Sequence, residues 1–276
     1  MEITPSIFTD VINSYLPEPE ASLLNGILFG ISLKTSKIFF EQLRTVGLLH
    51  LVVLSGANIS LLAGMVGQTA RYVGKKTNIL ITVIVVVLFI VFVGCQAPVV
   101  RAGFMAVFTY VAIVFGKKRL MTVSLILSLL FIAVFWPQWL TSLSLLLSYG
   151  ATLGIILFHR ETVFRKNRSR SRLANFVGET LAGAKNEFRL SLSAQVFTAP
   201  IIFIAFRQIS FISPVANVLV AWLVAPLMVF GFLAAIIGRI SPVLGWLPAI
   251  ICYGLLTYMV WIVRLLAGLP FASMNL

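Results

Sequence analysis

Long runs of apolar residues follow one another along most of the chain, with short polar or basic segments between them. A helix needs about 20 mainly apolar residues to cross the ~30 Å hydrocarbon core of a bilayer, and each run has roughly that length. We therefore expect about eight transmembrane helices, near residues 46–68, 79–95, 98–116, 120–136, 139–158, 188–206, 211–238 and 244–268. The tight turns at Pro98 and Pro137 also suit broken or re-entrant helices, which would lower the count.

The first 45 residues have a different pattern. Apolar residues recur at helical spacing over 7–16 and again over 23–31, with a turn at 17–19 that contains two prolines. Both stretches are too short to span a bilayer, and such amphipathic helices lie in the membrane interface. We therefore divide the chain into an N-terminal amphipathic, interfacial segment, residues 1–45, and a transmembrane domain, residues 46–276.

Composition agrees with this division. Hydrophobic residues make up 60% of the chain and charged residues 11%. A soluble domain cannot keep that much apolar surface from water, so the predicted fold is all-α, a polytopic transmembrane helix bundle. Cys95 and Cys252 lie in apolar runs and lack metal-ligand spacing. We expect no metal site and no cofactor.

The net charge of +13 is concentrated in particular loops. Basic residues follow the first, third, fifth and seventh spans: Arg71, Lys75, Lys76, Lys117, Lys118, Arg119, Arg160, Arg165, Lys166, Arg168, Arg170, Arg172, Lys185 and Arg239. Basic loops remain in the cytoplasm, so this pattern predicts that these loops are cytoplasmic and that both termini lie outside.

Acidic residues are distributed unevenly. None occurs between Glu41 and Glu161, and none follows Glu187. Ion-coupled transporters usually place a carboxylate in mid-membrane, and the spans offer none. Acids are rare in any apolar span, which is one explanation. The other is that a polyanion passes through the protein, because carboxylates along its path would repel it.

Three consecutive spans carry polar residues at helical spacing. The stripe residues are Thr141, Ser144, Ser148 and Thr152 in the fifth span, Glu187, Ser191, Gln195 and Thr198 in the sixth, and Ser213 and Asn217, ahead of Pro226, in the seventh. A single hydroxyl is typical of helix–helix contact, but three adjacent stripes favour a solvated interior.

The first span has two groups of small and polar residues. Gly56, Ser60 and Gly64 form a ridge on which another helix can pack closely. Ser55 and Asn58 lie on a neighbouring face, where they either belong to a packing seam or face a pore.

Two arginines lie near the predicted outer side. Arg101, about one turn inside the third span, either snorkels to the interface or offers a fixed positive charge for phosphate. Arg207 would extend such a positively charged funnel.

Four motifs occur in a defined order: TVGLLHLVVLSG at 45–56, APVVRA at 97–102, LSLLLSYGATLG at 143–154, and a region from 193 to 217 with the elements AQ, TAP, QIS and PVAN. Together they resemble the membrane-channel domain of the ComEC family of competence proteins, over about residues 22–240. Asn58 stands where the family often has His, so a proton-linked role is not transferred to this position.

The resemblance implies a multi-pass channel of the cytoplasmic (inner) membrane that imports single-stranded DNA in natural transformation and is not an enzyme. The chain has no P-loop, so the pulling force would come from a separate cytoplasmic ATPase or helicase, or from capture of the strand inside. Other expected partners are membrane lipid, separate DNA-receptor or nuclease proteins and, as one alternative, a second copy of the chain. The candidates for the DNA pathway are Ser55, Asn58, Arg101, Ser144, Ser148, Gln195, Thr198, Arg207 and Asn217.

Two other functions would also use these residues. A secondary transporter for a small anionic solute would use the same polar faces. An intramembrane serine protease would use Ser55 as the nucleophile, but His50 lies five residues away on another face of the same helix, and His159 lies at the cytoplasmic rim. The base that a protease needs is therefore missing.

Overall fold

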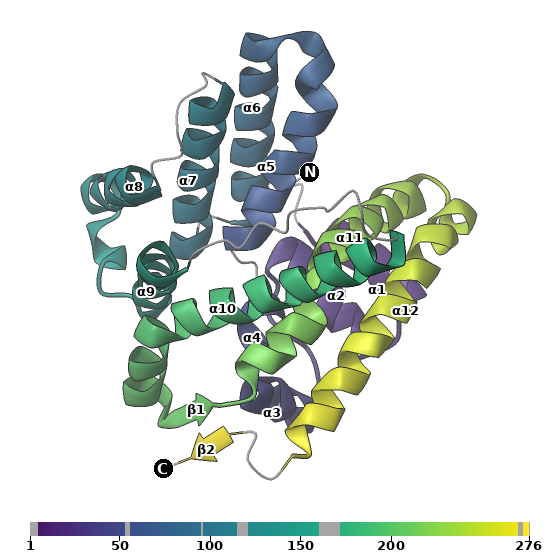
Figure 1. Cartoon of the computed structure of the whole chain (residues 1–276). Helices are drawn as coiled ribbons and strands as arrows, with labels where there is room; N and C mark the ends of the chain where they lie inside the picture. Colours follow the sequence, from purple (N-terminus) through teal and green to yellow (C-terminus); the bar gives the residue numbers. More distant parts are fainter. Residues whose placement is uncertain are drawn as a thin grey trace.

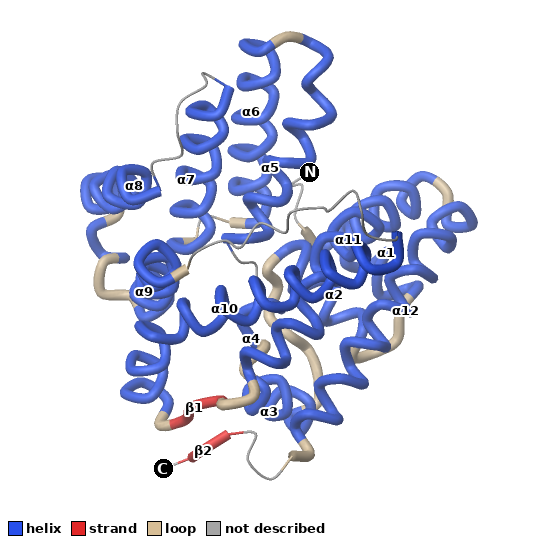
Figure 2. The backbone as a smooth tube through the Cα atoms, in the orientation of Figure 1, coloured by secondary structure: helices blue, strands red, loops and turns tan. Residues whose placement is uncertain are grey.

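A computed structural model of the chain describes residues 5–52, 56–94, 96–114, 121–159, 172–269 and 273–275 (Figure 1). Its helices are α1 (Ser6–Tyr15), α2 (Glu20–Phe29), α3 (Lys37–Val46), α4 (Leu49–Val52), α5 (Gly56–Thr69), α6 (Lys75–Val93), α7 (Ala97–Val114), α8 (Met121–Phe135), α9 (Leu143–Phe158), α10 (Arg172–Phe206), α11 (Ser213–Ile240) and α12 (Pro242–Ala267), with the short 3-10 turns η1 (Ala70–Val73) and η2 (Pro137–Trp139). Two short strands, β1 (Gln208–Ser210) and β2 (Ser273–Asn275), pair antiparallel (Figure 2). The predicted helical class is confirmed.

Four helices are long and apolar enough to cross a membrane. They contain the segments Lys76–Val93, Thr180–Ala205, Ser213–Ile240 and Pro242–Ala267. The helices α7, α8 and α9 coincide with further predicted spans but are shorter. The first predicted span is divided between α4 and α5, with residues 53–55 outside the described part. The chain is therefore a membrane protein with four clear candidate spans.

The main core is built around α2. All 10 residues of α2 are buried, and its leucines and Ile27 are 0% exposed. The helix is enclosed by α1, α4, α11 and α12, which are far from one another in the sequence. The prediction that this stretch lies in the membrane interface is wrong. Its sequence, EASLLNGILF, has apolar or small residues on every face, as a fully buried helix does.

The amphipathic helix α1 packs against the junction of α11 and α12. The Tyr15 hydroxyl donates a hydrogen bond to the Pro242 carbonyl oxygen at 2.8 Å. A Cβ atom added to Gly238 would lie 2.7 Å from the Tyr15 Oη atom, so glycine is needed for this close approach.

The chain ends lie at opposite ends of α11. The α1 helix lies beside the end that carries Arg239, whereas β2 pairs with β1, which precedes the start of α11. This helix has 28 residues, or about 42 Å of length. Between these two ends, α2 packs against α11 and α3 contacts β1 (Figure 1). The membrane side of each terminus stays a prediction.

A second group of helices, α5 to α9, lies beside this core. Ile59 of α5, Phe89 of α6 and Val99 of α7 belong to one buried cluster. The Phe232 ring of α11 joins the two groups, since it lies 6.0 Å from the Phe29 ring and 5.9 Å from the Phe89 ring. The long helix α10 packs along α9 and also contacts α11 (Figure 1).

Close helix packing uses other glycines than the predicted ridge. A Cβ atom on Gly64 would meet nothing within 4 Å, and Ser60 is exposed. Gly56 begins α5, and its packing lies outside the described contacts. Close approaches occur instead at Gly154, beside the Ser193 carbonyl of α10, and at Gly231, beside α2. The spacing of small residues shows only that they share one helix face, and does not show whether another helix packs on that face.

Candidate functional site

Arg101 is a buried cation between α7 and α9. Its side chain is 6% exposed. The Nη1 atom donates to the Thr152 Oγ1 atom at 2.9 Å and lies 3.2 Å from the Met105 Sδ atom, and the guanidinium carbon lies 5.5 Å from the centre of the Tyr149 ring. Of the two interpretations of Arg101, snorkelling does not match this placement. The side chain points into the protein.

The charge on Arg101 has no acidic neighbour in the described part of the chain. The ion pair found there joins Arg44 and Glu41 of α3, at 3.5 Å. The Arg101 Nε atom is buried without a hydrogen-bond partner among the described residues. A buried cation is normally paired, because removing it from water costs several kcal/mol. Arg101 therefore stands out as a positive charge available to an anion.

A polar network connects Arg101 to α8. The Tyr149 hydroxyl lies 2.8 Å from the Ser128 Oγ atom, which also donates to the Leu125 carbonyl oxygen at 2.7 Å. The predicted site contained neither Tyr149 nor Ser128. A tyrosine in mid-span is a usable signal, since a buried phenol hydroxyl normally has a partner.

The polar stripe of α9 is only partly used in this network. Thr152 accepts the Arg101 hydrogen bond and donates to the Ser148 carbonyl oxygen at 2.8 Å. Ser148 is half-buried, whereas Ser144 and Thr141 are exposed. The face of α9 that meets α10 consists of glycine positions, because Cβ atoms at Gly150 and Gly154 would contact Phe197.

The stripes of α10 and α11 meet at one point. The Asn217 Nδ2 atom donates to the Ser191 Oγ atom at 2.7 Å, and both residues are buried. The Thr198 hydroxyl donates to the Ala194 carbonyl oxygen of its own helix at 3.1 Å. Gln195 is half-buried. Asn217 thus serves a helix contact, while Gln195 and Thr198 remain partly accessible.

Asn58 and Arg207, which the structure describes, do not share a site with Arg101. Asn58 is 1% exposed, and its Nδ2 atom donates to the Ile27 carbonyl oxygen at 3.0 Å, which favours the packing interpretation. Arg207 is exposed at the junction of α10 and β1, with a φ of 51°. Ser55 lies outside the described residues. The His50 Nδ1 atom lies 2.9 Å from the Gly47 carbonyl oxygen, within its own segment.

One carboxylate does lie inside the bundle. Glu20 is 7% exposed in α2, and its Oε1 atom lies 3.5 Å from the Thr257 hydroxyl of α12. Glu20 belongs to α2, outside the eight predicted spans, so the expectation that those spans carry no mid-membrane carboxylate stays a prediction. Among the described residues, no group of three or more His, Cys, Asp or Glu could hold a metal ion.

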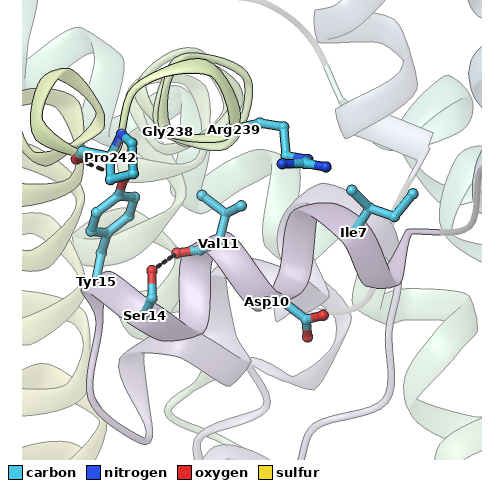
Figure 3. Close-up of a pocket in the computed structure, with 8 residues that line it drawn as sticks. All are labelled: Ile7, Asp10, Val11, Ser14, Tyr15, Gly238, Arg239 and Pro242. Carbon is cyan, nitrogen blue, oxygen red and sulfur yellow. Dashed lines mark hydrogen bonds between the residues drawn. The ribbon is translucent and has the colours of Figure 1, made fainter.

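A hollow of about 490 Å³ lies where α1 meets α11 (Figure 3). Its lining residues include Asp10 and Tyr15 of α1 and Arg239 of α11. None of its lining residues belongs to the predicted pathway or to the Arg101 network. The hollow is an opening beside the Tyr15 contact and does not extend the candidate site.

A family model described as "Competence protein" matches residues 27–276. No curated protein and no solved structure gave a match. The family match covers the motifs at 45–56, 97–102, 143–154 and 193–217, so the resemblance to competence proteins is confirmed. The chain belongs to the Competence family, the ComEC/Rec2 competence protein domain.

Proposed function

We propose that this chain is a multi-pass channel of the cytoplasmic membrane that imports single-stranded DNA during natural transformation. Family membership supports a role in competence. The observation that carries the channel is the buried Arg101 charge, which has no ion pair in the described part of the chain. A DNA strand carries one negative charge per phosphate and can supply the missing counter-charge as it passes.

The short helices suit a conduit. The helices α8 and α9 have 15 and 16 residues. They are therefore about 22–24 Å long, less than the ~30 Å of hydrocarbon. We propose that they cross the membrane beside a water-filled vestibule, which makes up the missing length. With α4 and α5 as one broken span, the eight-span arrangement then holds.

The proposed DNA pathway contains fewer of the candidate residues than the sequence suggested. Polar pairs in which both residues are buried, such as Asn217 and Ser191, are excluded from it. We assign it to the partly accessible polar residues of α9 and α10, together with Arg101 at one end: Ser144, Ser148, Thr152, Gln195 and Thr198. The chain then needs no catalytic residue of its own. A separate cytoplasmic ATPase or helicase and a separate receptor or nuclease complete the proposal.

Uptake of labelled DNA by cells tests the channel. Arg101→Ala and Gln195→Leu should each lower single-strand uptake about tenfold or more, which corresponds to ~1.4 kcal/mol of lost interaction. Arg264→Ala is the matched control, because Arg264 is exposed on α12. Protein levels in the membrane are measured in parallel. Normal uptake in both pathway variants, at normal protein level, would reject the channel.

A secondary transporter for a small anion is the second candidate, and Glu20 favours it. A buried carboxylate within a membrane bundle is a typical site for a coupling ion. Vesicles that contain the protein distinguish the two. A transporter would move small anions and lose this activity in Glu20→Gln, whereas a channel would pass oligonucleotides in both forms.

A further inference from the structure

The guanidinium of Arg101 uses only one of its edges. Both of its described hydrogen bonds start from Nη1, one to the Thr152 hydroxyl and one to the Met105 thioether. Nε has no partner, and no hydrogen bond from Nη2 occurs among the described residues. In arginine, the N–H groups on Nε and Nη2 point the same way and form a fork. This fork is unfilled in a side chain that is 6% exposed.

The neighbours of the guanidinium do not neutralise it. A thioether is a weak acceptor, and the Thr152 hydroxyl is neutral. The Tyr149 ring attracts the cation but supplies no acceptor for the Nε–Nη2 edge. The groups that pack around Arg101 thus fix its position while leaving its charge uncompensated.

We propose that the Nε–Nη2 edge of Arg101 binds one phosphate-type anion, and that its ligand is a phosphodiester of the passing DNA strand. Two parallel N–H donors match two oxygens of a phosphate, a geometry that lysine cannot offer. Thr152 and Tyr149 orient the fork. Met105 contacts Nη1 and leaves the Nε–Nη2 edge open. The identity of the ligand rests on the proposed channel function, whereas the anion site rests on the Arg101 contacts alone.

Substitution at Met105 tests the site without removing Arg101. In Met105→Glu, a carboxylate one helical turn from Arg101 would pair with the guanidinium and exclude other anions. In Met105→Gln, an acceptor of similar size would leave the charge unpaired. Both variants keep the rest of α7 unchanged, and their melting temperatures report whether they fold.

Binding is measured with the purified chain in a neutral detergent. The probes are a single-stranded oligothymidine, inorganic phosphate and phosphatidylglycerol micelles, at constant ionic strength in chloride. We expect the wild type and Met105→Gln to bind the oligonucleotide at least tenfold more tightly than Met105→Glu does. Equal oligonucleotide affinity in all three proteins would overturn the anion site. Selective binding of phosphate or of the lipid, but not of the oligonucleotide, would overturn the DNA assignment.

DNA uptake by cells separates this inference from the channel itself. If Met105→Glu loses oligonucleotide binding and uptake together, the site lies on the DNA path. If Met105→Glu loses binding but imports DNA normally, while Gln195→Leu imports none, the channel stands and the role of the Arg101 site in it is refuted.

Discussion

The contact between α2 and α11 gives the sharpest test of the fold. A Cβ atom on Gly231 would lie 2.8 Å from the Leu28 Cδ1 atom and 3.0 Å from the Leu24 Cδ1 atom. Both leucines are 0% exposed. Carbon atoms in contact normally lie about 3.5–4.0 Å apart. The substitution Gly231→Ala therefore forces these leucine side chains, or α2 itself, to shift, and Leu28→Ala should create the space that the new methyl group needs.

The expected free energies of unfolding follow from these distances. Overpacking by one methyl group costs about 1–3 kcal/mol, and alanine recovers up to about 1 kcal/mol of helix propensity. Gly231→Ala should thus destabilise by about 0–3 kcal/mol. Leu28→Ala should cost about 2–5 kcal/mol, as for a buried leucine. The double variant should be more stable than the sum of the single changes, by about 1–2 kcal/mol.

Reversible unfolding in mixed micelles, followed by tryptophan fluorescence, measures this coupling. Gly254→Ala is the matched control on α12, because its Cβ atom would meet nothing within 4 Å. It should stabilise by up to about 1 kcal/mol through helix propensity and show no coupling to Leu28→Ala. Additive effects of the two substitutions would show that Leu28 does not face Gly231. A cost below about 0.5 kcal/mol for Leu28→Ala would indicate that α2 lies at the membrane surface and not in the core.

Three further changes test other contacts by the same unfolding assay. Gly154→Ala should destabilise by about 1–3 kcal/mol because the methyl group meets the Ser193 carbonyl. Gly183→Ala should not destabilise, because a Cβ atom there lies in open space. Equal effects of the two substitutions would contradict the α9–α10 contact. Tyr15→Phe should cost about 0.5–1.5 kcal/mol through its lost hydrogen bond to α12, and no change would argue against that bond. Asn58→Leu should cost about 1–3 kcal/mol, since it leaves a buried carbonyl of α2 unpaired. DNA uptake should fall only as far as the protein level falls. A stable variant without uptake would give Asn58 a place in the pathway.

The sequence pattern predicted where the helices lie in the chain better than it predicted which helices pack together. Seven of the expected spans coincide with helices, from α6 to α12, because long apolar runs are a local signal. The burial of α2 was missed because ten apolar residues suit an interfacial helix and a core helix equally well by length. The burial of Glu20, which is 7% exposed, was missed for the same reason.

The candidate site was predicted in part. Arg101 could be found, because a charge inside an apolar run is conspicuous. Its partners could not, because Thr152 lies 51 positions away and nothing in the spacing relates α7 to α9. Helical spacing also suggested that Asn217 faces a lumen, whereas its amide is bonded to Ser191. Periodicity gives a polar face, but tertiary contacts decide which polar residues are left for a substrate.

Photocrosslinking during uptake tests the central claim most directly. A photoreactive amino acid is placed at Ser148, which is half-buried on the proposed pathway, or at Trp261, which is 58% exposed on the outer face of α12. The DNA conduit predicts crosslinks between the incoming strand and position 148, and none to position 261. Cells that import DNA normally while position 148 gives no crosslink would contradict the account.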